Sequence, residues 1–165
     1  MAAQADGAGA MTEVAIAILF QGDRYLMQLR DDIPTIVYPG HWTFFGGHLE
    51  PGESPEVGVW RELEEEIQYR PPWLRLFERR VEGTVARNVF YGPLTVPLAE
   101  LTLCEGWDLD LWTVAEVERG ERYSQRAQQV KPMGKPHQGI LRQFIAQRSR
   151  LVPPAGDDPL AMERG

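Results

Sequence analysis

Residues 54–72 carry paired start and stop signals for a helix, and this helix constrains the fold more than any other segment. Ser54 has a hydroxyl that can cap the exposed amide groups of a first turn. Pro55 suits the first helical position because its missing N–H needs no partner there. Pro71 and Pro72 must end the helix. We therefore expect one helix between these limits, packed through one of its faces.

The two faces of this helix have opposite chemistry. Its large apolar side chains share an arc of about 100° and predict burial against a sheet. Glu62, Glu65 and Glu66 share another arc of about 100°, where like charges repel each other by a few tenths of a kcal/mol per pair. Such a strip makes physical sense chiefly where a cation binds, and hard oxygen ligands select Mg²⁺ or Mn²⁺. The apolar arc consists of Val59, Trp60, Leu63 and Ile67.

A glutamate run taken alone is more often a solvated helix face than a metal site. In this chain the run follows a Gly-Gly pair, a further glutamate and an arginine at fixed spacings. These spacings resemble the Nudix box, the signature of the Nudix hydrolase family: glycine, five residues, glutamate, seven residues, then Arg-Glu-apolar-any-Glu-Glu-any-Gly-apolar. The box extends from Gly47 to Tyr69, and the positions in register are Gly47, Glu53, Arg61, Glu62, Leu63, Glu65 and Glu66.

One position departs from the family pattern, because Gln68 stands where the box usually has glycine. A non-glycine residue that adopts the left-handed conformation there costs on the order of 1 kcal/mol. We therefore expect the helix to continue toward Arg70 instead. This position supplies no metal ligand in the family, so the departure concerns local loop geometry more than catalysis.

The resemblance implies a role for each matched residue. Glu62, Glu65 and Glu66 would be metal ligands, and the backbone carbonyl of Gly47 would complete the site. Glu53 and Arg61 would pair, so that a bidentate guanidinium locks the loop before the helix against its first turns. The alternative for this pair is an ordinary surface ion pair, which contributes little.

The implied reaction is hydrolysis of a diphosphate linkage by attack of water at phosphorus. Mg²⁺, or Mn²⁺, would neutralise the diphosphate oxygens and lower the pKa of the attacking water. The substrate would be a nucleoside diphosphate linked to another moiety, in the nucleoside triphosphate or nucleotide sugar class. The general base is not determined, and its candidates are Glu62, Glu65 and a glutamate outside the helix. Glu105 is the best outside candidate, although a solvated turn residue is the other interpretation.

Specificity is expected from residues outside the box. The loop from Arg30 to Trp42, with the strand after it, carries aromatic side chains that can stack on a base or a sugar. The same aromatics could equally serve to pack the loop onto the sheet. The candidates for substrate contact are Tyr38, His41, Trp42 and Phe44.

The order of the remaining elements predicts an α/β (α+β) chain with helices packed on a mixed sheet. The resemblance implies a Nudix-type α/β/α sandwich in residues 12–150, between disordered tails at residues 1–11 and 151–165. Thr12–Phe20 and Tyr25–Leu29 should form a hairpin. The other expected strands are His41–Phe45, Trp73–Val81, Val85–Tyr91 and Leu109–Val114, and a final helix should cover about His137–Arg148.

The bulk composition excludes several functions. A net charge of −7 argues against binding of a nucleic acid polymer, including an RNA 5′-end pyrophosphohydrolase activity. No apolar run approaches the roughly 20 residues that span a bilayer, and no secretory signal precedes the first strand, so we expect a cytoplasmic protein. The family also allows a homodimer. A catalytically silent nucleotide-binding module remains as an alternative, while Cys104 lacks the neighbours that a prenyl diphosphate isomerase would need.

Overall fold

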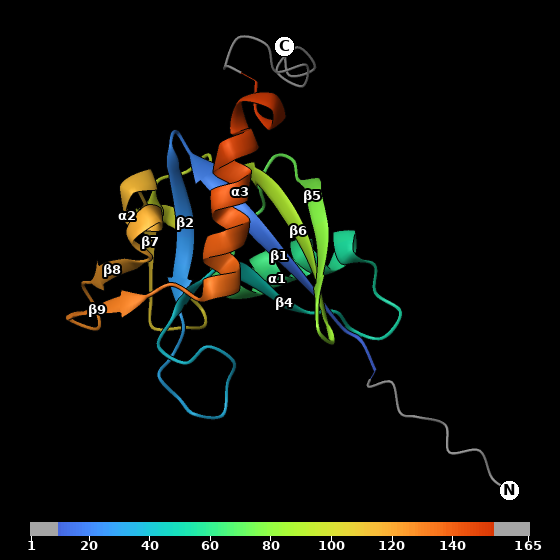
Figure 1. The fold of residues 1–165 in the computed structure, drawn as a ribbon, viewed down its shortest axis with the longest axis horizontal. Coiled ribbons are helices and arrows are strands. Elements are labelled where there is room, and N and C mark those ends of the chain that lie inside the picture. The colour runs from blue at the N-terminus through green and yellow to red at the C-terminus, as the bar shows by residue number, and fades with distance from the viewer. Residues whose placement is uncertain (1–9, 154–165) are drawn as a thin grey trace, which may run out of the picture.

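A seven-stranded mixed sheet forms the middle layer of the computed structural model, which describes residues 10–153 (Figure 1). The central strand β1 (Thr12–Gln21) runs parallel to β6 (Val85–Pro93), and β5 (Arg75–Glu82) pairs antiparallel with β6 at the sheet edge. The other strands of this sheet are β2 (Arg24–Leu29), β3 (Trp42–Thr43), β4 (Phe45–His48) and β7 (Asp108–Trp112), and a separate hairpin consists of β8 (Glu121–Ser124) and β9 (Gln129–Pro132).

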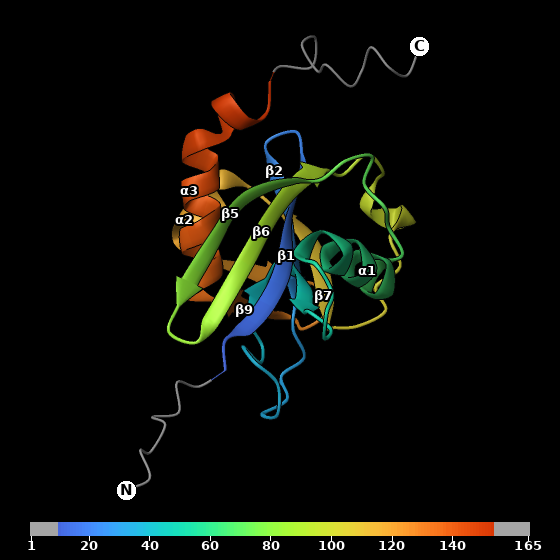
Figure 2. The same ribbon diagram turned by 90° about the vertical axis from the view of Figure 1, so that its right-hand side faces the viewer.

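Helices cover both faces of the sheet, so the expected α/β/α sandwich with a mixed sheet is confirmed. Figure 2 shows the sheet between the helices, with α3 on one side and α1 on the other. The helices are α1 (Pro55–Ile67), α2 (Val114–Arg119) and α3 (Lys135–Leu151), with a 3-10 turn, η1 (Leu98–Glu100). None of the helices in residues 10–153 is long and apolar enough to cross a membrane.

One edge of β1 pairs with β6, and its other edge pairs with two strands, β4 and β2. β4 pairs with the first half of β1, from Val14 opposite His48 to Ala17 opposite Phe45. β2 pairs with its end, where Phe20 lies opposite Tyr25, as the predicted hairpin requires. The short strand β4 is therefore held against the middle of the sheet, directly before the loop that leads into α1.

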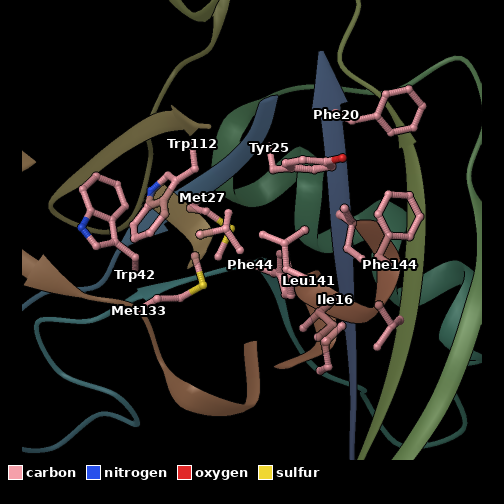
Figure 3. Packing of buried hydrophobic residues seen from close by; sticks show 14 of the residues in the cluster. Ile16, Phe20, Tyr25, Met27, Trp42, Phe44, Trp112, Met133, Leu141 and Phe144 are labelled. Carbon is pink, nitrogen blue, oxygen red and sulfur yellow. The ribbon is translucent and has the colours of Figure 1, made fainter. Parts of the chain in front are cut away.

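Side chains of β1 alternate between two cores, as a strand covered on both faces demands. Ala15 and Ala17 face α1, where their small size leaves room for the fully buried Leu63. Ile16 and Ile18 face the other way, into the aromatic core beneath α3 that Figure 3 shows. The apolar arc of α1 is thus packed on the sheet, and its glutamates lie along the flanks.

The start of α1 agrees with the prediction. The Ser54 hydroxyl accepts a hydrogen bond from the amide of Val57 at 3.2 Å, and Pro55 occupies the first turn. Buried side chains on one arc, including Val59 and Ile67, orient the helix. Local sequence signals and packing therefore act together at this end.

The predicted extension of α1 toward Arg70 is wrong. The helix ends at Ile67, and Gln68 adopts the left-handed conformation with φ 50° and ψ 40°. The turn buries Tyr69, whose hydroxyl donates to the Pro93 carbonyl at 3.1 Å and accepts from the amide of Thr95 at 2.9 Å. These tertiary contacts offset the strain of a non-glycine residue, which the sequence pattern alone does not reveal.

Two further predictions needed correction near the C-terminal half. The strand expected to reach Val114 ends at Trp112, because Thr113 and Glu116 form a capping box that starts α2. The last helix is longer at both ends than predicted. Neither α2 nor the β8–β9 hairpin was expected, since each is too short to show clear periodicity. Most of the expected tails, residues 1–9 and 154–165, lies outside the described residues.

Replacement of Gln68 by glycine is expected to raise the free energy of unfolding by about 0.5 kcal/mol, because glycine adopts positive φ without a steric penalty. Gln68→Ala should give no gain, since alanine keeps the Cβ atom. Urea denaturation of the three proteins measures the difference. Equal stabilities of the glycine and alanine variants would contradict a left-handed residue at this position.

Candidate active site

A cavity of about 840 Å³ opens beside the first turn of α3, on the sheet face that α3 covers only in part. Strands β1 and β6 contribute its sheet wall, and the loop between β2 and β3 contributes Ile36, Val37 and Tyr38. This loop projects from the lower end of the sheet in Figure 1. On the side of α1, the cavity is lined by Gly46, Gly47, Glu62 and Glu66.

Two glycines on β4 let this strand pack closely against β1 on one side and against a side chain of α1 on the other. Gly46 has φ 138°, and a Cβ atom there would lie 2.1 Å from the carbonyl oxygen of Ala15. A Cβ atom on Gly47 would lie 2.7 Å from Oε1 of Glu62. Since real side chains do not tolerate such distances, the Gly-Gly pair is a steric requirement for placing the Glu62 carboxylate against β4.

Glu66 is held in a fixed orientation at the same place. It is only 4% exposed, and its two oxygens accept hydrogen bonds from the Gly46 amide and from Nε2 of Gln28, both at 3.0 Å. Gln28 is itself buried and also donates to the Phe44 carbonyl at 3.2 Å. The carboxylate is therefore positioned by donors from β2 and β4 before any ligand binds.

The electrostatics of this carboxylate favour its neutralisation by a proton or a cation. Burial, followed by the charge of Glu62, raises the pKa of Glu66 to about 9, although the bonds from Gly46 and Gln28 favour the ionised form. Two carboxyl groups that face each other in a partly buried site are costly unless a proton or a cation neutralises them. Their hard oxygen atoms suit Mg²⁺ or Mn²⁺, so these residues fit a divalent cation.

Arg61 fastens the loop before α1 to the helix. Its Nε and Nη2 donate to the two oxygens of Glu53 at 2.7 and 2.8 Å, which is the bidentate pairing that the resemblance implied. Nη2 also donates to the His48 carbonyl at 3.2 Å. The hydrogen bonds from Arg61 hold the pKa of Glu53 at about 2. The Glu53 side chain is 7% exposed, so this pair differs from an ordinary surface ion pair.

The third predicted ligand faces a different neighbour. Glu65 is 54% exposed and accepts from Nη1 of Arg61 at 3.2 Å, while the same nitrogen donates to Glu62 at 3.1 Å. Within residues 10–153, no three acidic, histidine or cysteine side chains form a ready-made metal cage. The structure thus brings Glu62 and Glu66 together in the cavity, and metal-ligand roles for these two residues, for Glu65 and for the Gly47 carbonyl stay predictions.

The four aromatic candidates for substrate contact separate into two groups. Tyr38 and Phe44 line the cavity, and both rings pack against His137, with centroids 5.6 and 5.3 Å away. Trp42 is fully buried and packs edge to face on Trp112 at 5.6 Å, as Figure 3 shows. Its pairing with Leu29 on β2 directs it into the core beneath α3.

His41 contacts the Tyr38 ring rather than the cavity. Its ring centroid lies 6.1 Å from that of Tyr38, and Nδ1 lies 2.8 Å from the Pro39 carbonyl oxygen. It is not among the residues that line the cavity. The position of His41 favours a role in shaping the loop.

Glu105, the candidate base from outside the helix, is exposed and lines the cavity. Its loop is fixed beside the end of α1, because the amide of Cys104 donates to the backbone carbonyl of Glu66 at 2.8 Å. Glu105 therefore stands on the same side of the cavity as Glu62 and Glu66.

Sequence reasoning missed Gln28, Arg87 and His137. These residues lie on β2, β6 and α3, far apart along the chain, and the fold brings them to the same cavity. A single polar residue within an apolar strand was the available signal for Gln28. For Arg87 and His137 no local pattern distinguished a cavity residue from a surface residue.

In metal-free buffer the free energy of unfolding is expected to fall as the pH rises from 7 to 9. The folded-state pKa of Glu66, about 9, exceeds its ordinary value of 4.5, so in this window the folded protein holds a proton that unfolding releases, and each rise in pH favours the unfolded state. The slope should be on the order of 1 kcal/mol per pH unit at most. His137, whose pKa is lowered from 6.5 to about 3, gives the opposite slope only below pH 6.5.

Glu66→Gln should abolish this slope, because the amide does not titrate. Urea denaturation in EDTA at several pH values measures it for both proteins. If wild type and variant lost stability in parallel, the slope would come from another group.

Comparisons with known proteins agree with this architecture. The NUDIX domain family model matches residues 11–130. No curated protein matches the chain significantly. The fold resembles that of a MutT from a joint study of the Aliivibrio salmonicida and Vibrio cholerae proteins. The identity is 22%, the TM-score is 0.64, and the similarity covers 83% of this chain and 98% of that one.

Two similar structures were determined with ligands. The NUDIX domain of Shewanella oneidensis NrtR, complexed with ADP ribose, is 20% identical over 91% of this chain and 94% of its own, with a TM-score of 0.59. A bifunctional NMN adenylyltransferase/ADP ribose pyrophosphatase from Francisella tularensis, complexed with AMP and a Mn ion, is 18% identical over 83% of this chain and 42% of its own, also with a TM-score of 0.59. These likenesses show the fold, and the family model matches most of the chain, so the chain belongs to the Nudix domain family.

Proposed function

We propose that this chain hydrolyses the diphosphate linkage of a nucleotide, by attack of water at phosphorus, in a reaction that requires Mg²⁺ or Mn²⁺. One observation carries the proposal: the buried Glu66 carboxylate faces Glu62 on the floor of a cavity large enough for a nucleotide. Such a pair has no purpose in packing, because an apolar pair of similar size would cost less to bury. It suits a site that attracts a cation.

Glu62 and Glu66 would hold the cation, and Glu65 would join them if Arg61 released it. A divalent cation at this place supplies positive charge to the diphosphate oxygens. Gln28 and the Gly46 amide fix the Glu66 carboxylate, so that little reorganisation is needed when the substrate enters. The pairing of Arg61 with Glu53 keeps the preceding loop in place.

The proton of the attacking water needs an acceptor in the cavity. Glu62 and Glu105 are the candidates, because both line the cavity on the side of α1. Glu66 is less suitable, since its oxygens already accept two hydrogen bonds. A pH profile of kcat/KM for Glu105→Gln separates the two, since loss of the acidic limb would identify Glu105 as the base.

A nucleotide is the proposed substrate class. The cavity has aromatic walls at Tyr38 and Phe44, which can contact a base or a sugar. Tyr38 has a positive φ of 55°, and such strained conformations occur often at binding sites. Two structures with the same fold carry ADP ribose or AMP, which makes compounds of this kind the first to test.

One observation favours a binding module without catalysis as a second candidate. Nη1 of Arg61 contacts both Glu62 and Glu65, so part of the positive charge that the glutamates need is supplied from within the chain. If this arrangement persisted with ligand bound, the domain would bind nucleotides without cleaving them. The activity measurement below decides between the two candidates.

The decisive experiment measures phosphate release from nucleoside triphosphates, nucleotide sugars, ADP-ribose and dinucleoside polyphosphates, with coupling enzymes, in Mg²⁺ or in EDTA. Wild type should turn over at least one compound with Mg²⁺ and none in EDTA. Glu66→Gln should lower kcat by about 100-fold or more, because the cation loses a fixed ligand. Glu64→Gln is the matched control on the same helix, since Glu64 pairs with Arg70 in an exposed ion pair.

Metal binding is expected to be measurable without turnover. Binding of Mn²⁺ reduces the signal of the free ion in electron paramagnetic resonance, and Glu66→Gln should weaken this binding while Glu64→Gln leaves it unchanged. Binding of Mn²⁺ and nucleotide without turnover on the whole panel would favour the module. Equal Mn²⁺ affinity of wild type and Glu66→Gln would remove the metal site from the proposal.

A further inference from the structure

Three further hydrogen-bond donors line the cavity: Arg30 after β2, Arg87 on β6 and His137 in the first turn of α3. Arg87 is only 8% exposed. Its Nη1 donates to Glu82 at 3.2 Å, and Glu82 is half-exposed. The described part of the chain offers no other acceptor to this guanidinium, so most of its five donors are left to the cavity.

Arg30 is a second cation at the cavity and, unlike Arg87, has no counterion in the described part of the chain. Within residues 10–153 no carboxylate forms an ion pair with it, and its buried Nε has no hydrogen-bond partner. The neighbouring Asp31 also lines the cavity but does not pair with Arg30. Asp32 lies near Lys131 instead, at 3.8 Å. The guanidinium of Arg30 is thus available to a ligand anion.

His137 adds a neutral donor to this cluster. Its Nδ1 accepts a hydrogen bond from the Phe44 amide at 3.3 Å, which places the ring proton on Nε2. Burial, followed by the charges of Arg87 and Arg30, lowers the pKa of His137 to about 3. The ring therefore donates from Nε2 without a charge, and the amide end of α3 adds positive potential at the same place.

The register of the sheet separates Arg87 from the glutamates. Arg87 pairs with Val14 on β1, and Val14 pairs with His48 on β4, next to Gly47. Two strand spacings, or roughly 10 Å, thus lie between Arg87 and the strand against which Glu62 rests. The cavity has an acidic end at α1 and a basic end at β6 and α3.

We propose that Arg30, Arg87 and His137 form a subsite for a second anionic group of the substrate, a phosphate monoester or a carboxylate, in which Arg87 lies roughly 10 Å from the β4 strand at Gly47. The inference rests on the proposed function, because it assumes that the diphosphate binds at the glutamates. It narrows the substrate class to diphosphate compounds whose far moiety carries an anion.

Two positive charges held near one histidine are unfavourable. The buried Arg87 guanidinium has Glu82 as its acceptor, the buried Nε of Arg30 has none, and the two charges near His137 repel each other. An anion offsets both costs through charge-assisted hydrogen bonds, which a neutral sugar or base provides less well. The aromatic rings of Tyr38 and Phe44 close the subsite on the side of His137.

Binding of inorganic phosphate in EDTA tests the subsite without metal or turnover. Without a cation the acidic end repels phosphate, so any specific binding occurs at the basic end. The side-chain Nε–Hε resonances of Arg30 and Arg87 should shift saturably in NMR spectra. Parallel titrations with acetate distinguish a phosphate site from a carboxylate site by their relative affinities.

Arg87→Gln and Arg30→Gln should each weaken binding of the favoured anion by about tenfold, because each removes a charge-assisted hydrogen bond. Arg70→Gln is the control, since Arg70 is 63% exposed, pairs with Glu64 and is not among the residues that line the cavity. Arg87→Lys keeps the charge and should lose less than Arg87→Gln. If Arg87→Gln fails to fold, Arg30→Gln decides, because Arg30 is less buried.

Absence of a saturable shift for both anions, or equal affinity in wild type and Arg30→Gln, would overturn the subsite. This outcome leaves the hydrolase proposal intact, because that proposal depends on Glu66 and a cation. Conversely, a protein that binds phosphate in EDTA but cleaves nothing retains the subsite and loses the hydrolase. The two proposals therefore fail separately.

Discussion

The close approach of α1 to the Gly46-Gly47 backbone determines where the charges of the candidate active site lie. A Cβ atom on Gly46 would collide with the β1 backbone, and one on Gly47 would collide with Glu62, so β4 lies against β1 and receives the Glu62 carboxylate only because both side chains are absent. The approach buries Glu66 and presses Glu62 against the strand. The repulsion of the two carboxylates, the orienting bonds from Gln28 and Gly46, and the affinity expected for a cation all follow from this contact.

Fixed geometry is the common property of the charged groups around this contact. Glu53 and Arg61 form two parallel hydrogen bonds, and Glu66 accepts from donors on two different strands. Groups that are held before the substrate arrives need little reorganisation during the reaction, which is the main source of electrostatic catalysis. The basic end differs, because Arg30 and Arg87 retain donors that no described residue occupies.

The sequence predicted features that depend on neighbours along the chain. Ser54 and Pro55 define the start of α1 through local capping, and the spacing of Leu63 and Ile67 defines its buried face. Prediction from the sequence failed at places where segments that are distant along the chain come into contact. The left-handed turn at Gln68 is stabilised by contacts of the next residue with β6 and the segment after it, about 25 residues later. The positions of Gln28, Arg87 and His137 depend on strand order, which local periodicity does not contain.

The shared edge of β1 has a consequence for how this protein acquires its site during folding. β1 is completed by pairing with β2, β4 and β6. The residues of β6 lie more than 70 positions along the chain from their partners on β1. A nascent chain that ends after α1 already contains every residue of the family motif, yet the parallel edge of β1 is still open. The segment between β1 and β6 is long, so the conformational entropy that is lost when these two strands pair makes their pairing slow. The motif is therefore complete in sequence well before the surface that supports it exists.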